Sequence, residues 1–306
     1  MPRSSPLLLA AVAALAFAAC GSPEAPSATP DAGGPPTYTL PHDAGKADVT
    51  EVDAKTPWAR MQAHAHVVLA SMRVQVVYLG GEGSGGGADS FDPFIDWLLT
   101  SSYWGIVKQY GVGPGTRIGS VRLPPDAVIP AAAVKDGLIT AEDLEAAVFA
   151  ALHPGGDVDA GADAGDGEGG EEGGAAPDAS TPPRLIPAAD AYVFFLPAGV
   201  NVNLGQRGAH TFQTCVEAGG YHSHDGAEPY AVLPPCTFGR SPLAVSHEIA
   251  EMATDPVPGN GWFSDKDADN AGGEIGDLCN QSAPHGADGW DVTQLWSNAD
   301  GDCEPN

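Results

Sequence analysis

Two long segments of this chain nearly lack the large apolar residues that a folded core requires, and this limits the fold more than any other feature. Residues 20–56 are mainly Pro, Ala, Ser, Asp and Gly, and residues 154–183 contain eight acids and no Lys or Arg. Such segments bury too little surface to offset the entropy lost on ordering. We therefore predict a disordered tether over 20–56 and a disordered acidic insertion over 154–183. One large domain over 57–306 takes the remainder, about 220 of the 306 residues.

The N-terminal segment is typical of an exported protein. Residues 1–19 contain an apolar run that is too short to cross a bilayer as a helix, which predicts a signal peptide. Ala18 and Ala19 precede Cys20, an arrangement that resembles a bacterial lipoprotein cleavage site. We predict that Cys20 is the lipidated first mature residue and that the protein is anchored at the cell envelope. Plain secretion is the alternative.

The balance of charge excludes one class of partner. Acidic residues outnumber basic ones 40 to 13, which gives a formal net charge of −27. Nucleic-acid binding needs clustered Lys and Arg, so no nucleic acid is expected. Electrostatic attachment to an anionic bilayer is disfavoured for the same reason. The expected partners are the membrane, reached through the lipid on Cys20, and an extracellular ligand or substrate.

The apolar patterns alternate between strand-like and helix-like segments. Short runs rich in β-branched and aromatic residues predict strands at 73–79, 191–196 and 230–233. The run at 191–196 is almost continuously apolar, which predicts a strand buried on both faces. Helical patterns cover 58–72, 92–110, a segment that starts at Thr140, and 242–254. The prediction is a single α/β or α+β domain with a mixed sheet.

Four cysteines follow Cys20. An even number in an exported protein favours two disulfides over free thiols, with three connectivities open. We predict the local pairs Cys215–Cys236 and Cys279–Cys303, because each closes a short loop rich in Gly. A zinc site built from thiolates is the alternative, although the chain has no Cys-x-x-Cys pair to support it.

The predicted helix at about 242–254 carries the clearest chemical signal. Ser241 is a good N-cap, Pro242 suits the first turn, and Pro256 ends the run. At about 100° per residue, His247 and Glu251 stand one turn apart on one polar face, with Glu248 beside them.

This is the layout of a zincin helix, in which two ligands at i and i+4 hold the metal ion and the Glu after the first ligand is the general base. His247 and Glu251 are then metal ligands and Glu248 is the catalytic base. Glu251 replaces the usual second His, and a carboxylate ligand also admits a harder metal than zinc. The alternative is an amphipathic surface helix whose polar face is simply hydrated.

Two further segments offer a third ligand. His222 and His224 lie on the same side of an extended segment, as strand alternation requires, and Glu274 lies in an acidic run after the helix. We predict a zinc site made by His247, Glu251 and either His222 or Glu274. Solvent exposure of the two histidines is the alternative.

A second acidic run gives calcium as a weaker prediction. Residues 265–270 are similar to the start of a calcium loop, but the Gly at the sixth position and the Glu at the twelfth are missing, which excludes an EF-hand. A non-standard calcium site that includes Asn298, Asp300 and Asp302 stays open.

Several motifs together resemble the EXORDIUM, or phosphate-induced, protein family, whose plant members are secreted proteins linked to growth control and which has bacterial relatives. The matching segments are 246–251, 254–256, 261–263, 274–277 with Cys279, and the Gly-Tyr-His at 220–222. The resemblance implies an extracellular location and a role at the cell envelope or matrix, and it attaches no reaction to the chain.

Two hypotheses from different classes follow. The first is a metal-dependent hydrolase of peptide-like bonds with the HExxE helix as its active site. The second is a non-enzymatic extracellular binding or signalling protein in which the same cluster is a structural metal site or holds no metal. Motifs of serine hydrolases, P-loop nucleotide-binding proteins and dinucleotide-binding proteins are absent from the sequence.

Overall fold

The computed structural model describes residues 60–65, 67–80, 90–154, 186–207, 210–226, 228–265, 273–279 and 285–305. The predicted signal peptide, Cys20, the tether and residues 155–183 of the acidic insertion lie outside the described residues.

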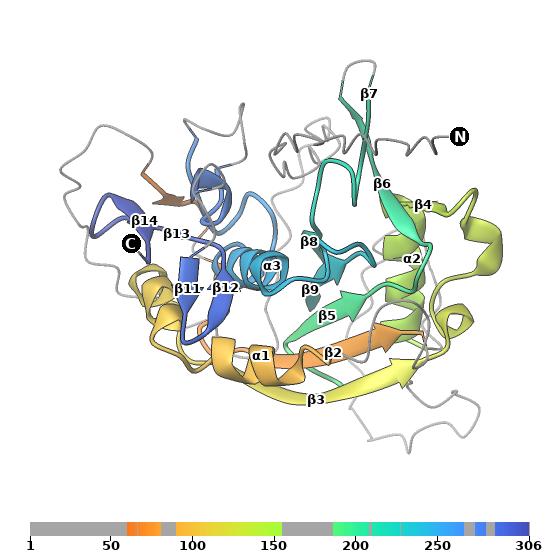
Figure 1. Ribbon diagram of the computed structural model, residues 1–306, viewed down its shortest axis with the longest axis horizontal. Helices are drawn as coiled ribbons and strands as arrows, with labels where there is room; N and C mark the ends of the chain where they lie inside the picture. The colour runs from red at the N-terminus through yellow and green to blue at the C-terminus, as the bar shows by residue number, and fades with distance from the viewer. Residues whose placement is uncertain are drawn as a thin grey trace, which may run out of the picture.

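A five-stranded mixed sheet forms the centre of the described chain (Figure 1), with the strand order β3-β2-β5-β9-β8. Its strands are β2 (Arg73–Leu79), β3 (Thr116–Leu123), β5 (Ala191–Phe195), β8 (Tyr221–Asp225) and β9 (Glu228–Leu233). The first three and β9 run parallel, and β8 pairs antiparallel with β9 at one edge. The predicted strands and the mixed sheet are confirmed.

The sheet separates two apolar cores. In β5, Ala191, Val193 and Phe195 face one core while Tyr192 and Phe194 face the other, and all five side chains are fully buried. A strand that is covered on both faces needs apolar residues at every position. This explains why the sequence of β5 is continuously apolar.

Helices cover both faces of the sheet (Figure 1). Helices α1 (Asp92–Leu98) and α3 (Pro242–Thr254) and the 3-10 helix η1 (Tyr103–Tyr110) belong to one core, and α2 (Ala141–Leu152) belongs to the other. A smaller sheet, ordered β4-β6-β7 (Leu138–Thr140, Asn201–Arg207 and His210–Gln213), lies on the α2 side. The fold is therefore a mixed α/β arrangement of layers, as predicted.

Three short antiparallel ladders complete the side of α1 and α3. They pair β1 (Gln62–Ala63) with β10 (Trp262–Phe263), β11 (His285–Ala287) with β12 (Trp290–Val292), and β13 (Leu295–Ser297) with β14 (Asp302–Glu304). Single 3-10 turns occur at η2 (Pro125–Ala127), η3 (Ala131–Ala133) and η4 (Asp277–Cys279).

Both predicted disulfides are present. Cys215 pairs with Cys236, and Cys279 at the end of η4 pairs with Cys303 in β14. Because disulfides persist in oxidising compartments, this pairing points to an extracellular or otherwise oxidising location. Within the described ranges, no helix has the length and apolar character needed to cross a membrane.

Two helix predictions are wrong in part. The described part of the predicted helix at 58–72 holds β1 and irregular chain, because the N–H groups of residues 64, 65 and 69 donate to the carbonyls of residues 261, 260 and 253. The predicted helix at 92–110 is divided into α1 and η1. At the break, Thr100 and Ser101 donate their hydroxyls to carbonyls of α1, a local alternative that ends regular helix.

Candidate metal centre

Local signals at both ends of α3 set its bounds. The Ser241 side chain accepts a hydrogen bond from the N–H of Ala244 at 3.2 Å, which satisfies an otherwise unpaired donor of the first turn. After the helix, the carboxylate of Asp255 accepts hydrogen bonds from the backbone N–H groups of residues 259–261 at 2.6–3.1 Å. These contacts turn the chain back sharply, so the predicted helix bounds are confirmed.

Helix α3 is buried on all sides. Val245, Ile249 and Met252 pack into the apolar core, and on the other side His247, Glu248 and Glu251 are each at most 5% exposed. The alternative of a surface helix with a hydrated polar face is therefore wrong. Burying ionisable groups is costly unless they pair or bind an ion, so this polar side needs partners.

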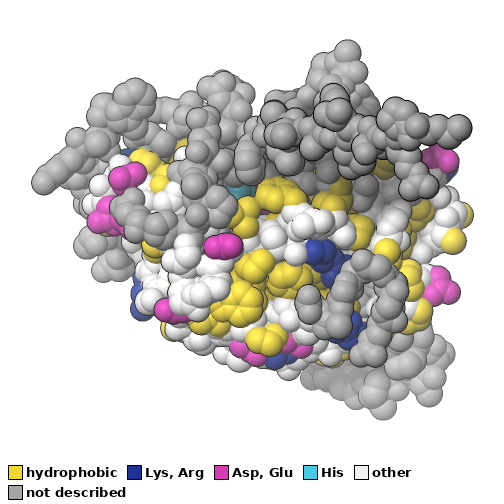
Figure 2. Space-filling model, in the orientation of Figure 1, with side chains coloured by type: hydrophobic (Ala, Val, Ile, Leu, Met, Phe, Trp, Pro, Cys, Tyr) yellow, Lys and Arg dark blue, Asp and Glu magenta, His cyan; other side chains and the backbone are white. Residues whose placement is uncertain are grey.

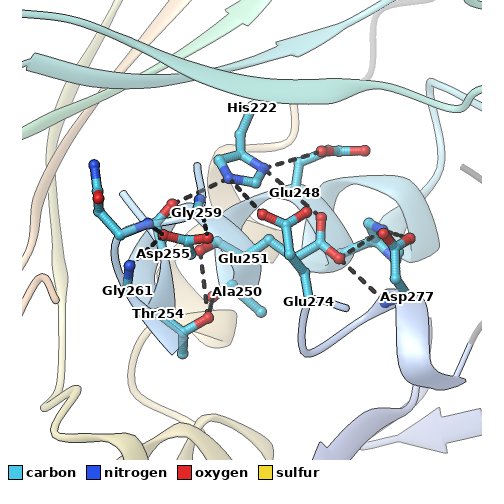
Figure 3. A network of polar contacts seen from close by, with 12 residues as sticks. His222, Glu248, Ala250, Glu251, Thr254, Asp255, Gly259, Gly261, Glu274 and Asp277 are labelled. Atoms are coloured by element: carbon cyan, nitrogen blue, oxygen red, sulfur yellow. Dashed lines mark hydrogen bonds and ion pairs between the residues drawn. The ribbon is translucent and has the colours of Figure 1, made fainter. Parts of the chain in front are cut away.

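The first set of converging donors contains His247, Glu251 and Asp277. His247 Nε2 lies 3.0 Å from Glu251 Oε1 and 3.5 Å from Asp277 Oδ1. Two donors about 2.1 Å from a tetrahedral zinc ion lie about 3.4 Å apart, so these separations suit a shared ion. Asp277 reaches the helix because its own N–H donates to Glu251 Oε1 at 3.1 Å (Figure 3).

Gly276 lets the chain before Asp277 approach this set closely. A Cβ atom at Gly276 would lie 2.6 Å from His247 Nδ1 and 2.9 Å from Glu251 Oε1. A larger residue would push the two donors apart. Gly276 is therefore part of the geometry, although it carries no ligand atom.

The second set contains His222, Glu248 and Glu251. From β8, His222 Nδ1 lies 3.7 Å from Glu251 Oε2 and 4.0 Å from Glu248 Oε2. Its Nε2 lies 3.1 Å from the backbone carbonyl of Asp255 and 3.3 Å from Glu274 Oε1 (Figure 3). Because a carbonyl can only accept, the proton belongs on Nε2, which leaves the lone pair of Nδ1 facing two carboxylates. A ligating histidine typically donates its other N–H in this way.

Burial and charge together set the protonation of these groups. Burial dominates at His222 and lowers its pKa, which favours the neutral ligating form. Burial also opposes the charged form of His247, but Glu251, Asp277 and Glu248 outweigh it and raise its pKa well above the usual value. Burial raises the pKa of Glu248 well above its usual range. At Glu251 burial is outweighed by the two histidines, and the pKa is lowered.

All five residues of the predicted site lie in one buried network, but the donor atoms of four of them divide between two sets. His247 and His222 belong to different sets, and Glu251 is common to both through its two oxygens. Glu274 contacts His222 without joining either set. The choice among the predicted ligands and the role of Glu248 stay predictions.

Asp277 is the donor that the sequence-based ligand set lacks. It lies in the same acidic run as Glu274, three residues further on, and that run is the signal that could have found it. His224, which shares a strand face with His222, is only half-buried and bonds locally to Gly226.

The weaker calcium prediction gains no ligand set among the described residues. Asn298 uses its side-chain oxygen to accept from Met61 N and Trp296 Nε1, both at 3.0 Å. Asp300 pairs with Ser297, and Asp302 is exposed. Neither converging set in the described chain includes them. Residues 266–270 of the acidic run lie outside the described residues.

The chain matches no protein-family model, no curated protein and no solved structure. The chemistry of this site therefore rests on its own geometry.

Proposed function

We propose that the cluster on α3 binds one divalent metal ion, zinc in the first instance, and that the protein is a metal-dependent hydrolase of peptide-like bonds. The observation that carries the proposal is the convergence of His247, Glu251 and Asp277 in a buried site. Nitrogen and carboxylate donors at these separations suit zinc, and three protein ligands are the number found in catalytic zinc sites.

Glu248 is the proposed general base. It follows His247 on the helix, and its raised pKa brings a carboxyl group closer to neutral pH, which suits a group that must both accept and return a proton. A bound zinc ion would polarise the scissile carbonyl and make water more acidic. His222 holds the opposite side of the site, with its ring fixed by the carbonyl of Asp255.

Burial of the cluster favours a second candidate. With His222, His247 and Glu251 each at most 5% exposed, a polymeric substrate has little direct access in this conformation. The same donors would then hold a structural ion in a non-enzymatic extracellular binding or signalling protein. Structural sites are closed, whereas catalytic sites keep an open ligand position.

Metal content and hydrolysis separate the two candidates. We expect the purified full chain to contain one zinc per molecule by elemental mass spectrometry, and we expect the His247→Ala variant to lose it. Glu248→Gln should keep the zinc and lose cleavage of a mixed peptide library read by mass spectrometry. Glu142→Gln, an exposed acid on α2, is the matched control and should change neither.

These measurements decide between a catalytic and a structural metal site. Zinc retained by wild type with no cleavage, together with unfolding when zinc is removed, would replace the hydrolase by the structural site. A metal-free protein that folds normally would overturn both forms of the proposal.

The proposed location is the outer side of a cell membrane, with a lipid on Cys20 and an envelope role like that of EXORDIUM-related proteins. The two disulfides support an oxidising compartment. Cys20→Ser should move the protein from the detergent phase to the aqueous phase in detergent partitioning of the cell envelope. Unchanged partitioning would contradict the lipid anchor.

A further inference from the structure

Two arginines lie together at the end of the central sheet, without an acidic partner in the described part of the chain. Arg122 is the penultimate residue of β3, and its guanidinium lies 4.4 Å from the ring centroid of Tyr78. Arg240 immediately precedes the N-cap of α3, and its guanidinium lies 4.9 Å from the ring centroid of Phe195. The two rings stack on each other at 4.9 Å, so both cations rest on one aromatic pair.

Neither guanidinium has a carboxylate partner among the described residues. Arg240 donates Nη2 to the carbonyl of Leu196 at 2.5 Å, while its buried Nε has no hydrogen-bond partner in the described ranges. Asp92, which bonds the Tyr78 hydroxyl at 2.9 Å, is also held by Arg117 and Ser120. A buried N–H of a cation without an acceptor is costly, and its presence requires a reason.

The pair is also electrostatically unfavourable as it stands. Burial lowers the pKa of Arg240; Tyr78 opposes this effect, and the nearby charge of Arg122 adds to it. The chain has 40 acidic and only 13 basic residues, so its sequence offers many possible acidic partners for these two arginines. Two neighbouring cations that have no acidic partner among the described residues and rest on aromatic faces form a site for an anionic ligand.

The position in the fold supports a ligand. Tyr78, Arg122 and Phe195 lie at the carboxyl ends of the parallel strands β2, β3 and β5. The chain leaves β2 for α1 on one face of the sheet, and it leaves β5 for β6 on the other face. Adjacent strands whose connections go to opposite faces open a crevice at their carboxyl ends, and open α/β sheets bind ligands there.

Figure 2 shows Lys and Arg side chains in dark blue among hydrophobic side chains in yellow, to the right of the centre of the view. We propose that Arg122 and Arg240, seated on Tyr78 and Phe195, bind an oxyanion, a carboxylate or phosphate group of a ligand. The guanidinium fork matches two oxygens of either group. This site is separate from the metal centre and does not depend on the proposed hydrolase.

Anion titrations of the full chain test the proposal. Sodium phosphate and sodium acetate are titrated separately by calorimetry at an ionic strength held constant with sodium chloride. We expect saturable binding of at least one of them, weakened about tenfold or more in Arg122→Gln and in Arg240→Gln. Lys108→Gln removes an exposed cation on η1 and should leave the affinity unchanged.

The two anions distinguish the source of the ligand group, since binding of phosphate alone assigns a phosphoryl group and binding of acetate alone assigns a carboxylate. Arg122 is exposed, so its variant should fold even if Arg240→Gln does not. Absence of saturable binding, or binding that both arginine variants retain, would overturn the proposal. Binding abolished by His247→Ala would place the anion on the metal centre and would also overturn it.

Discussion

At the residue scale, His247 sets the conditions under which the cluster can hold a metal ion. Its two nearest carboxylates, Glu251 and Asp277, favour the imidazolium, and a metal ion must displace that proton to reach Nε2. The side chain that binds the metal is thus also the one whose protonation competes with it.

This competition predicts a strong pH dependence of metal affinity. The pKa of His247 lies well above 6.5, so below neutral pH each ion bound releases a proton from it. We expect zinc affinity to fall as the pH is lowered from 7.5 to 6, approaching about tenfold per pH unit below the pKa of His247, measured by competition with a chromophoric chelator of known pH dependence. An affinity that stays constant across this range would contradict the assignment of His247 as a ligand.

Gly276 offers a test that leaves every ligand atom in place. A Cβ here would lie 2.6 Å from the His247 ring, so Gly276→Ala should displace that ring. We expect a zinc affinity at least about tenfold weaker and a loss of about 1–3 kcal/mol in unfolding free energy by urea denaturation. Gly286→Ala is the control, because a Cβ there meets nothing within 4 Å. Equal zinc affinities in the two variants would show that the close approach has no role.

At the scale of elements, the metal centre is assembled by three segments that are far apart in the chain. Helix α3 supplies His247, Glu248 and Glu251, β8 supplies His222, and η4 supplies Asp277. Figure 3 labels each of these residues except His247. Strand β8 is held in place by the sheet, and helix α3 is capped at its N-terminus by Ser241. The short turn η4 is held instead by the disulfide from Cys279 to Cys303 in β14.

The disulfide at η4 should therefore matter for metal binding in a way that the other does not. We expect the double variant Cys279→Ala, Cys303→Ala to lose zinc affinity as well as about 3 kcal/mol of stability. The pair Cys215–Cys236 closes a loop of similar length, and its double alanine variant should lower stability alone. Zinc titration and urea unfolding of both variants give the comparison, and equal losses of affinity would refute the role of η4.

The sequence predicts α3 well and the site only in part, for a physical reason. Ser241, Pro242 and Pro256 act within a few residues of themselves, so the helix bounds could be predicted from local signals. The register that pairs His222 with Ala231 depends on packing of the whole sheet, as does the approach of Asp277 to Glu251. The fold brings Arg122 and Arg240 close together, and no motif in the sequence relates these two residues.

The break in the predicted helix at 92–110 has the same origin. Its apolar spacing is helical throughout, and Phe94, Trp104 and Tyr110 are buried as that spacing predicts. The α-helix ends where the hydroxyls of Thr100 and Ser101 donate to carbonyls of α1, before η1 begins. Apolar periodicity predicts which side of a helix faces the core, but it does not predict where the helix ends.

At the scale of the whole molecule, the buried network links stability to pH. A raised folded-state pKa, as at His247 and Glu248, contributes stability that is complete below the unfolded pKa and is lost as the pH rises through the folded value. The lowered pKa of Glu251 contributes stability above 4.5 that is lost as the pH falls through its folded value.

Above pH 6.5 the contributions of His247 and Glu248 are both being lost and Glu251 adds nothing further, so the melting temperature of the metal-free protein should fall from pH 6.5 toward alkaline pH. In His247→Gln the fall above pH 6.5 should become shallower, because one of the raised groups is gone. Melting curves from pH 4 to 9 give the measurement. A wild-type melting temperature that rises steadily from pH 6.5 to 9 would contradict the raised pKa values of His247 and Glu248.

Glu251 has one further consequence, which concerns how the two donor sets communicate. Its Oε1 belongs to the set of His247 and its Oε2 to the set of His222, so an ion held on one side withdraws electron density from the other. Occupancy on either side must change affinity on the opposite side by the same factor. The Glu251 carboxylate therefore couples ion binding at His222 to ion binding at His247, although the described chain contains no hydrogen bond between the two rings.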